Sequence, residues 1–330
     1  MRITNKMLSN SFLNDVEVNL NNLKTLQQQL TSGKEVKRPS DDPFRVARSM
    51  QLHTDIGRNI QYNKNIEDAI NFLDVTDTAL GQVTNVFQRM RELLVSSGNG
   101  AYGEDEKKAI RDEINQKVSE LGQILNSNFD GKYVFAGTRA TTKPIIVESK
   151  ADKTSLDYNG RSGAKLDLTK ATDKDESKML GEKLTAEISQ GVVLEYNITA
   201  KDLLQFTVKG TGGKADKDVD VKEVLDKIVT HLNDPKAGAT ELNEDLQNID
   251  DAVGNLLKLR SEVGAKQNRM ESARDKNKEQ NFNLKQILSK TEDIDVSEKY
   301  MEYAVMQSVY LASLQTSSKI LQPTLMDYLR

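Results

Sequence analysis

The chain contains no cysteine and no tryptophan among its 330 residues. Without cysteine, disulfide bonds and thiolate metal sites are excluded, and the redox state of the compartment stays open. Aromatic residues make up only 5% of the chain and apolar residues 37%. A single large globular core is therefore not expected.

Proline is scarce, and its positions are informative. The five prolines leave two long proline-free runs, residues 44–143 and 236–322. Because proline interrupts helix interiors, these runs permit unusually long helices. Glycine is sparse at both ends and concentrated between Gly131 and Gly213. The composition thus predicts helical flanks around a turn-rich centre.

Neither sign of charge dominates, with 46 basic and 50 acidic residues. No basic patch points to nucleic acid as a partner. No run of eighteen apolar residues occurs, so membrane insertion is not expected. The start of the chain, MRITNKMLS, lacks the apolar segment of a signal peptide. If the protein is exported, we expect export without a cleavable signal peptide.

Both ends of the chain carry apolar residues at alternating steps of three and four, the spacing of a coiled-coil seam. A helix cannot bury such a stripe against itself, so each end needs a partner. We predict that the two ends pair with each other. The candidate assembly-interface residues are Leu13, Val16, Leu20, Leu23, Leu30, Tyr300, Leu311, Leu314, Leu321, Leu325 and Tyr328.

The loop at residues 32–43, SGKEVKRPSDDP, separates the first two helices. Gly33 can end a helix in the left-handed conformation, and Asp42 before Pro43 forms a helix start. Helical spacing then continues to about residue 97, and a further helix follows from about Glu104. Short alternating runs at residues 156–158, 192–198 and 204–208 predict antiparallel strands. The charged run at 170–178 reads as a solvated loop or helix.

Helical spacing returns after residue 220, so the expected fold is mainly α with a β-rich central insert. The long helices of both flanks form an antiparallel bundle with coiled-coil termini. We expect a terminal coiled-coil assembly domain (1–40 plus 291–330), a helical rod domain (41–140 plus 220–290) and a β-rich outward insert domain (141–219). We also expect the insert to have a core of its own, so that its deletion leaves the bundle folded.

No stretch of the sequence predicts an enzyme. His53 and His231 each lack a second ligand at helical spacing. Residues 98–103 spell G-x-G-x-x-G but follow a helix rather than a strand, and residues 216–227 lack the glycine and glutamate of a calcium loop. We assign no catalytic, cofactor-binding or metal-binding residue. The terminal stripes could merely close the bundle of one molecule, but their position at the chain ends favours self-assembly.

Five segments in order resemble the flagellin superfamily, and within it the branch of hook-filament junction proteins. These segments are the chain start, SGKEVKRPSDDP at 32–43, YVFAGT at 133–138, RSEVGAKQNRME at 260–271 and LMDYLR at 325–330. The resemblance covers both flanks, and the central insert matches only loosely. Arg330, as an additional last residue, departs slightly from the pattern of this branch.

The resemblance implies a structural protein of the bacterial flagellum that joins the hook to the filament and is exported by the type III apparatus. Its partners would be copies of itself in a ring, a neighbouring hook-associated protein, flagellin and an export chaperone. It would lie outside the cell, in the flagellum. Two alternatives stay open, namely filament flagellin itself and a secreted coiled-coil effector or adhesin.

Overall fold

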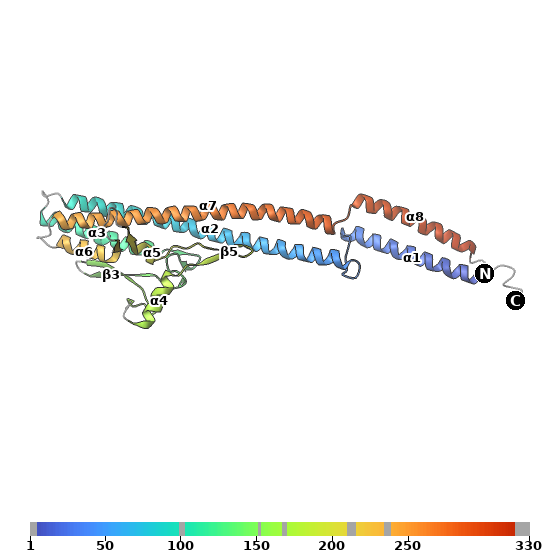
Figure 1. The fold of residues 1–330 in the computed structure, drawn as a ribbon, viewed down its shortest axis with the longest axis horizontal. Helices are drawn as coiled ribbons and strands as arrows, with labels where there is room; N and C mark the ends of the chain where they lie inside the picture. Colours follow the sequence, from blue (N-terminus) through green and yellow to red (C-terminus); the bar gives the residue numbers. More distant parts are fainter. Residues whose placement is uncertain are drawn as a thin grey trace. The chain divides into compact units, whose positions relative to one another are not determined.

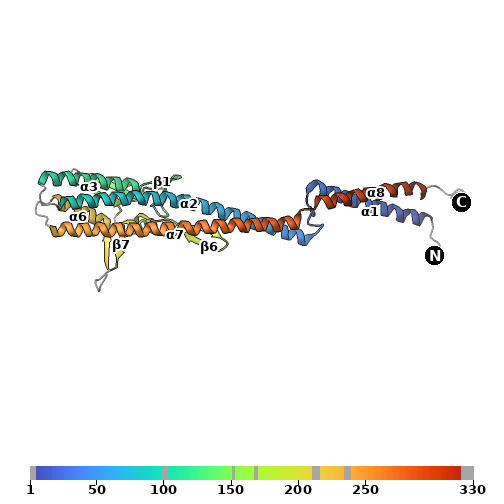
Figure 2. The same ribbon diagram turned by 90° about the horizontal axis from the view of Figure 1, so that it is seen from above.

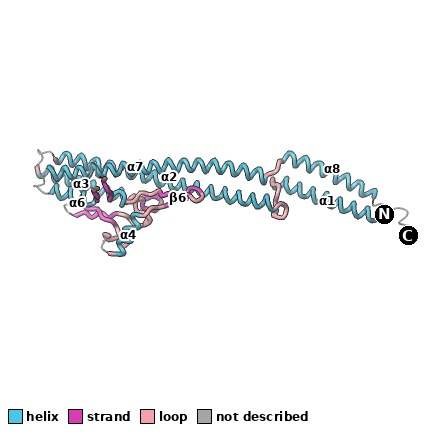
Figure 3. The backbone as a smooth tube through the Cα atoms, in the orientation of Figure 1, coloured by secondary structure: helices cyan, strands magenta, loops and turns pink. Residues whose placement is uncertain are grey.

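The computed structural model describes residues 5–98, 103–150, 153–166, 170–209, 216–233 and 239–320. Helices dominate it, and its strands are short (Figures 1 and 3). The sequence prediction of a mainly helical chain with a β-containing central insert is confirmed. In chain order the elements are α1 (Asn5–Ser32), α2 (Pro43–Ser97), α3 (Glu104–Leu125), β1 (Asn128–Phe129), β2 (Lys132–Tyr133), β3 (Ile145–Lys150), β4 (Lys153–Tyr158), α4 (Ala171–Gly181), β5 (Thr185–Ser189), β6 (Val192–Glu195), α5 (Ala200–Leu204), β7 (Gln205–Val208), β8 (Lys217–Asp220), α6 (Val221–Asn233), α7 (Ala239–Glu292) and α8 (Val296–Ile320).

The chain divides into two compact units. Unit 1 consists of residues 1–60 and 279–330, and unit 2 of residues 61–278. Unit 1 contains α1, α8, the start of α2 and the end of α7. The three-domain division expected from the sequence has other boundaries and stays a prediction.

The turn between α1 and α2 follows the local chemistry of its residues. Gly33 has a φ of +70°, the left-handed conformation that commonly follows the end of a helix. The Asp42 carboxylate accepts hydrogen bonds from the backbone N–H groups of Phe44 and Arg45, each at 3.1 Å. Pro43 is the first residue of α2, where its missing N–H has no cost. The helix end and helix start predicted for this loop are therefore confirmed.

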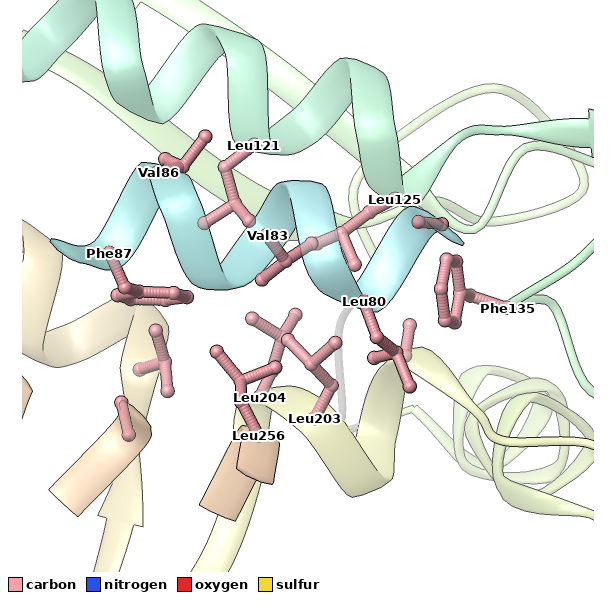
Figure 4. Close-up of a cluster of buried hydrophobic side chains, with 14 of the residues drawn as sticks. Leu80, Val83, Val86, Phe87, Leu121, Leu125, Phe135, Leu203, Leu204 and Leu256 are labelled. Carbon is pink, nitrogen blue, oxygen red and sulfur yellow. The ribbon is translucent and has the colours of Figure 1, made fainter. Parts of the chain in front are cut away.

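Unit 2 holds one continuous apolar core. Within this unit α2 lies beside both α3 and α7, and α5 and α6 cover the same cluster (Figures 1 and 2). Figure 4 shows Leu80 and Phe87 of α2 converging with Leu121 of α3, Leu204 of α5 and Leu256 of α7. All the described members of the cluster belong to unit 2. Each buried leucine or phenylalanine contributes about 1.5–3 kcal/mol through the hydrophobic effect.

The described strands pair as four separate antiparallel pairs, β1–β2, β3–β4, β5–β6 and β7–β8. Strands were expected at residues 156–158, 192–198 and 204–208. β4 contains the whole first run, whereas β6 and β7 cover only parts of the second and third. The reason lies at Thr199, whose side chain accepts a hydrogen bond from the Asp202 backbone N–H at 3.2 Å. This N-cap starts the short helix α5 between the two strand segments. The charged run at 170–178 lies mostly in α4.

The insert packs directly onto the helices. A Cβ atom at Gly122 of α3 would lie 2.2 Å from Cγ2 of Val147 in β3, so only glycine permits this close approach. Phe135 and Leu203 belong to the same buried cluster as the helix residues (Figure 4). The expectation that the insert has a core of its own is therefore wrong, because its buried side chains complete the core of the helices.

The YVFAGT stretch secures this attachment. Gly137 has a φ of +61°, and a Cβ atom there would lie 2.5 Å from the carbonyl oxygen of Met179. Two residues on, the buried Arg139 donates hydrogen bonds to Glu176 (2.9 Å) and to the carbonyl oxygen of Asn159. A buried guanidinium is stable only when it is paired in this way. The motif therefore ties α4 and the loop after β4 to the end of the β1–β2 segment.

Candidate assembly surface

Unit 1 is organised around α1 and α8, which lie side by side and run antiparallel (Figure 2). In each helix the half-buried residues recur at steps of three and four, as in a coiled-coil seam. The pairing of the two chain ends predicted from the sequence is therefore confirmed. The seam residues are Phe12, Val16, Asn19, Leu23, Leu26 and Leu30 in α1, and Lys299, Tyr303, Met306, Tyr310, Ser313 and Ser317 in α8.

The predicted stripe of α8 faces away from α1. Tyr300, Leu311 and Leu314 are 64%, 54% and 43% exposed, whereas Tyr303 and Tyr310 are half-buried in the seam. Two registers with three-and-four spacing run along α8, and both contain apolar residues. The periodicity alone could not show which of them contacts α1.

The predicted stripe of α1 is divided between two environments. Val16, Leu23 and Leu30 are half-buried on the side that faces α8, whereas Leu13 and Leu20 are exposed. The remaining predicted residues lie outside the described part of the chain, namely Leu321, Leu325 and Tyr328.

A second apolar stripe of α8 was missed by sequence reasoning. Met301, Val305 and Val309 are exposed on a face that differs from the predicted one. With Leu26 and Asn19 of α1 they line a groove of about 510 Å³. A four-residue apolar spacing at 301, 305 and 309 was the available signal, but it runs beside the stronger heptad pattern.

Charge is absent from most of α8. From Tyr303 to Ser317 no residue carries a charged side chain on any face. The segment carries neutral polar residues such as Gln307 and Ser308, but apolar residues also lie outside the seam, and α1 covers only one side of α8. The exposed apolar residues form a surface of the kind that marks contact with another protein.

The two connections that lead into α1 and α8 are joined to each other. The Glu35 backbone N–H donates to the carbonyl oxygen of Glu292 at 2.7 Å, and the Ile294 N–H donates to that of Gly33 at 3.2 Å. These two bonds form a short antiparallel bridge between the connections. The bridge fixes where the terminal pair begins.

Glu292 is the electrostatic centre of this crossing. Its carboxylate accepts hydrogen bonds from Lys34 Nζ (2.6 Å), Ser49 Oγ (3.0 Å) and His53 Nε2 (3.1 Å). Burial acts to raise the pKa of Glu292, but the hydrogen bonds from these three groups outweigh it and hold the pKa below its usual value. The ionised carboxylate therefore stabilises the crossing.

The same unit exposes further large apolar residues that sequence reasoning did not single out. Phe44 at the start of α2 is 88% exposed, and Phe282 of α7 is also exposed. Isolated aromatic residues give no periodic signal, so only the fold identifies them as unpartnered. They are further exposed apolar residues of unit 1, outside its terminal pair.

Neither histidine belongs to a catalytic arrangement in the described chain. His53 contacts Glu292 as above, and His231 Nδ1 lies 2.6 Å from Oδ2 of the buried Asp245. Burial raises the pKa of Asp245 above its usual value, and the contact with His231 opposes this shift. No group of three potential metal-ligating side chains occurs among the described residues, and none of the described helices could span a membrane.

Two family models built from known proteins match the helical flanks of the chain. The model of the bacterial flagellin N-terminal helical region matches residues 3–140, and that of the C-terminal helical region matches residues 246–329. These segments contain α1, α2, α3 and α8 and most of α7. The matched pair of regions is thus the same pair of flanks that the structure brings together.

Individual relatives span nearly the whole chain. Flagellar hook-associated protein 3 of Salmonella typhimurium is 22% identical over 325 residues, covering 96% of each protein. Flagellin of Bacillus subtilis is 26% identical over 310 residues, covering 92% of this chain and 90% of that protein. The crystal structure of the flagellar junction protein FlgL from Legionella pneumophila has a TM-score of 0.53 at 16% identity and covers 76% of this chain and all of that chain.

These relatives are structural proteins of the flagellum and not enzymes, in agreement with the sequence prediction. The fold is shared with hook-associated proteins, and the two matched regions account for both helical flanks. The chain therefore belongs to the bacterial flagellin family.

Proposed function

We propose that the protein is a structural subunit of the bacterial flagellum that joins the hook to the filament by self-assembly through its terminal helices. The observation that carries this proposal is the exposed apolar surface of α8, which surrounds a helix without charged residues from Tyr303 to Ser317. Hook-associated protein 3 and the junction protein FlgL are similar to the chain over most of its length or fold, which supports the junction role.

The exposed stripes supply the assembly contacts. We assign this role to Tyr300, Leu311 and Leu314 on one face of α8, with Leu13 and Leu20 of α1. Met301, Val305 and Val309 form a second contact face. Two different faces on one helix pair require neighbours on two sides. Such heterologous contacts close into rings or continue as helical tubes, which suits a ring of copies at the junction.

The subunit reaches this place by export from the cell, without a cleavable signal peptide, and lies in the extracellular flagellum. Its neighbours there are a second hook-associated protein and flagellin. Before assembly the apolar faces of α1 and α8 need cover, because an exposed patch of this kind promotes aggregation. An export chaperone that binds α8 would provide that cover.

A second candidate function is the filament subunit itself. The similarity to Bacillus subtilis flagellin at 26% identity over 92% of the chain favours it. The two functions differ in extent of assembly, since a filament subunit forms long tubes and a junction subunit forms a short segment. Electron microscopy of isolated flagella with labelled protein distinguishes a band at the hook end from label along the filament.

A substitution tests the assembly role in the same setting. Leu314→Asp places a carboxylate in the proposed contact, where an unpaired buried charge is strongly unfavourable. We expect hooks to persist while filaments fail to attach. Leu257→Asp is the control, because Leu257 is an exposed leucine of unit 2, at 54% against 43% for Leu314. Normal filaments in the Leu314→Asp strain would refute the proposed role of this face.

A further inference from the structure

Phe44 is the most exposed large apolar residue of the described chain, at 88%. Its backbone N–H donates a hydrogen bond to the Asp42 carboxylate at 3.1 Å, which caps the start of α2. A phenylalanine held in this way against water is unfavourable unless another surface covers it.

A cavity of about 230 Å³ lies at the same part of unit 1. The cavity is open to solvent: Val36, Val46 and Met50 supply its apolar lining, and Met50 is 64% exposed. Lys37 and Arg45 also line it, and Arg45 is paired with Glu35. The remaining lining comes from His53, Ser49, Thr291 and Glu292. A cavity of about 150 Å³ suffices for benzene, so this one has room for a phenyl ring. The Lys37 and Arg45 side chains of the lining can contact an aromatic ring through cation–π attraction.

Phe44 cannot fill this cavity in its own molecule. With 3.6 residues per turn, Phe44 points about 160° away from Val46 around α2. Ring and cavity therefore face opposite sides of one helix. They also lie at one level, because residues 44–53 span only about 14 Å along the axis.

We propose that Phe44 of one copy inserts into the Val36–Val46–Met50 cavity of the neighbouring copy. This contact rests on the proposed self-assembly and adds a site outside the terminal pair. A projecting ring and a cavity on opposite sides at one level generate a lateral, heterologous contact, which repeats from copy to copy around a ring. Phe282 and Tyr300 are also exposed aromatics of unit 1. Phe282 lies ten residues before Glu292 of the cavity lining, about 15 Å along α7, and Tyr300 lies on α8, which contributes no residue to that lining.

The absence of native cysteine makes disulfide trapping a clean test. The variant Phe44→Cys/Met50→Cys cannot close a disulfide within one chain, because residues six apart on a helix have Cα atoms more than 7 Å apart. The double variant is assembled at high concentration in ammonium sulfate, which strengthens apolar contacts, then oxidised and run on a non-reducing gel. We expect a ladder of covalent oligomers, and monomers from each single variant.

Sedimentation measures how much the proposed contact contributes to assembly. Phe44→Ala should raise the concentration needed for half-assembly at least tenfold, as expected for the loss of one buried phenyl ring. Leu257→Ala, the control, should change it less than twofold. Both positions are exposed in the monomer, so neither variant should alter folding, which circular dichroism verifies.

Three results would overturn the contact. They are unchanged assembly of Phe44→Ala, no ladder from the double variant, and dimers from Phe44→Cys alone, since the last would mean that the Phe44 residues meet each other. Failure of the unmodified chain to assemble at all would instead contradict the proposed function, and this inference would fall with it. If the unmodified chain and Phe44→Ala reach half-assembly at the same concentration, the proposed function is unaffected and only this contact is refuted.

Discussion

Units 1 and 2 of this chain use apolar residues in opposite ways. Every described member of the large buried cluster lies in unit 2, from Ile66 to Met270. In unit 1 the buried apolar side chains of the described residues are Leu52 and Ile56. Most of the large exposed apolar residues, by contrast, belong to unit 1.

We interpret this difference as follows: unit 2 buries its apolar residues within the monomer, whereas unit 1 leaves apolar residues exposed that neighbouring copies would cover in the proposed assembly. Unit 2 gains stability by removing apolar surface from water within the molecule. Unit 1 leaves α8 covered on one side only, so the corresponding free energy becomes available on assembly. Substitutions in the two units should therefore affect different measurements.

Removal of the insert should produce the largest effect on stability. Deletion of residues 144–209 takes Leu156, Leu203 and Leu204 out of the cluster that they share with the helices. We expect loss of cooperative unfolding and a large drop in helical circular dichroism. Val193→Ser, at an exposed position of β6, is the control and should unfold like the unmodified chain. A deletion variant that keeps full helicity would show that the helices of unit 2 have a sufficient core of their own.

A leucine substitution in each unit sharpens the contrast. Leu80→Ala removes a fully buried side chain and should cost about 2–5 kcal/mol of unfolding free energy. Leu314→Ala, at a 43% exposed position, should cost less than about 0.5 kcal/mol while weakening assembly. Urea unfolding and sedimentation measure the two effects. Equal loss of monomer stability in the two variants would contradict the distinction between the units.

The crossing at Glu292 predicts a pH effect confined to unit 1. The pKa of Glu292 is lowered in the folded state. The stability that its ionised carboxylate gives the crossing is therefore fully present above the ordinary pKa of about 4.5 and is lost as the pH falls through the lowered pKa. We expect exchange protection of the Glu35 and Ile294 amides to fall in that range, after correction for intrinsic rates. Glu292→Gln should abolish the pH dependence, and Glu279→Gln, at an exposed carboxylate of α7, should keep it. Unchanged acid sensitivity in Glu292→Gln would assign it to another group.

The smallest effect is expected at an ion pair on the surface of unit 2. Arg260 donates two hydrogen bonds to the Asp77 carboxylate, at 2.9 and 3.1 Å. Both side chains are more than one-third exposed, and such pairs contribute about 0.2–1 kcal/mol. Arg260→Met should therefore shift the urea midpoint only slightly, and less so at high salt. A shift as large as that of Leu80→Ala would show that the pair acts as part of the core.

The sequence was sufficient for the features that follow from local chemistry. Gly33, Asp42 and Pro43 predict the end of α1 and the start of α2 because helix termination and capping depend on a few neighbouring residues. The long proline-free runs permit helices as long as α2 and α7 but do not set where these helices end. Pairing of the chain ends follows from the three-and-four spacing on both.

Other features depend on contacts that periodicity does not encode. Tyr300, Leu311 and Leu314 and the seam residues Tyr303 and Tyr310 lie in two registers of one helix, and only packing against α1 separates them. Phe44 belongs to no periodic pattern in the sequence. Its proposed role depends on the capped start of α2 and on the cavity on the opposite side of that helix, which residue spacing does not reveal. The shared core of insert and helices likewise depends on distant residues.

Hydrogen exchange of the dilute monomer and of the assembled protein tests the central claim most directly. The account predicts slow exchange for residues 66–94 of α2 in both states. Residues 13–30 of α1 and 300–317 of α8 should exchange fast in the monomer and slowly after assembly, because neighbouring copies cover them. Strong protection of both terminal segments in the dilute monomer, with no oligomer present by sedimentation, would contradict the account.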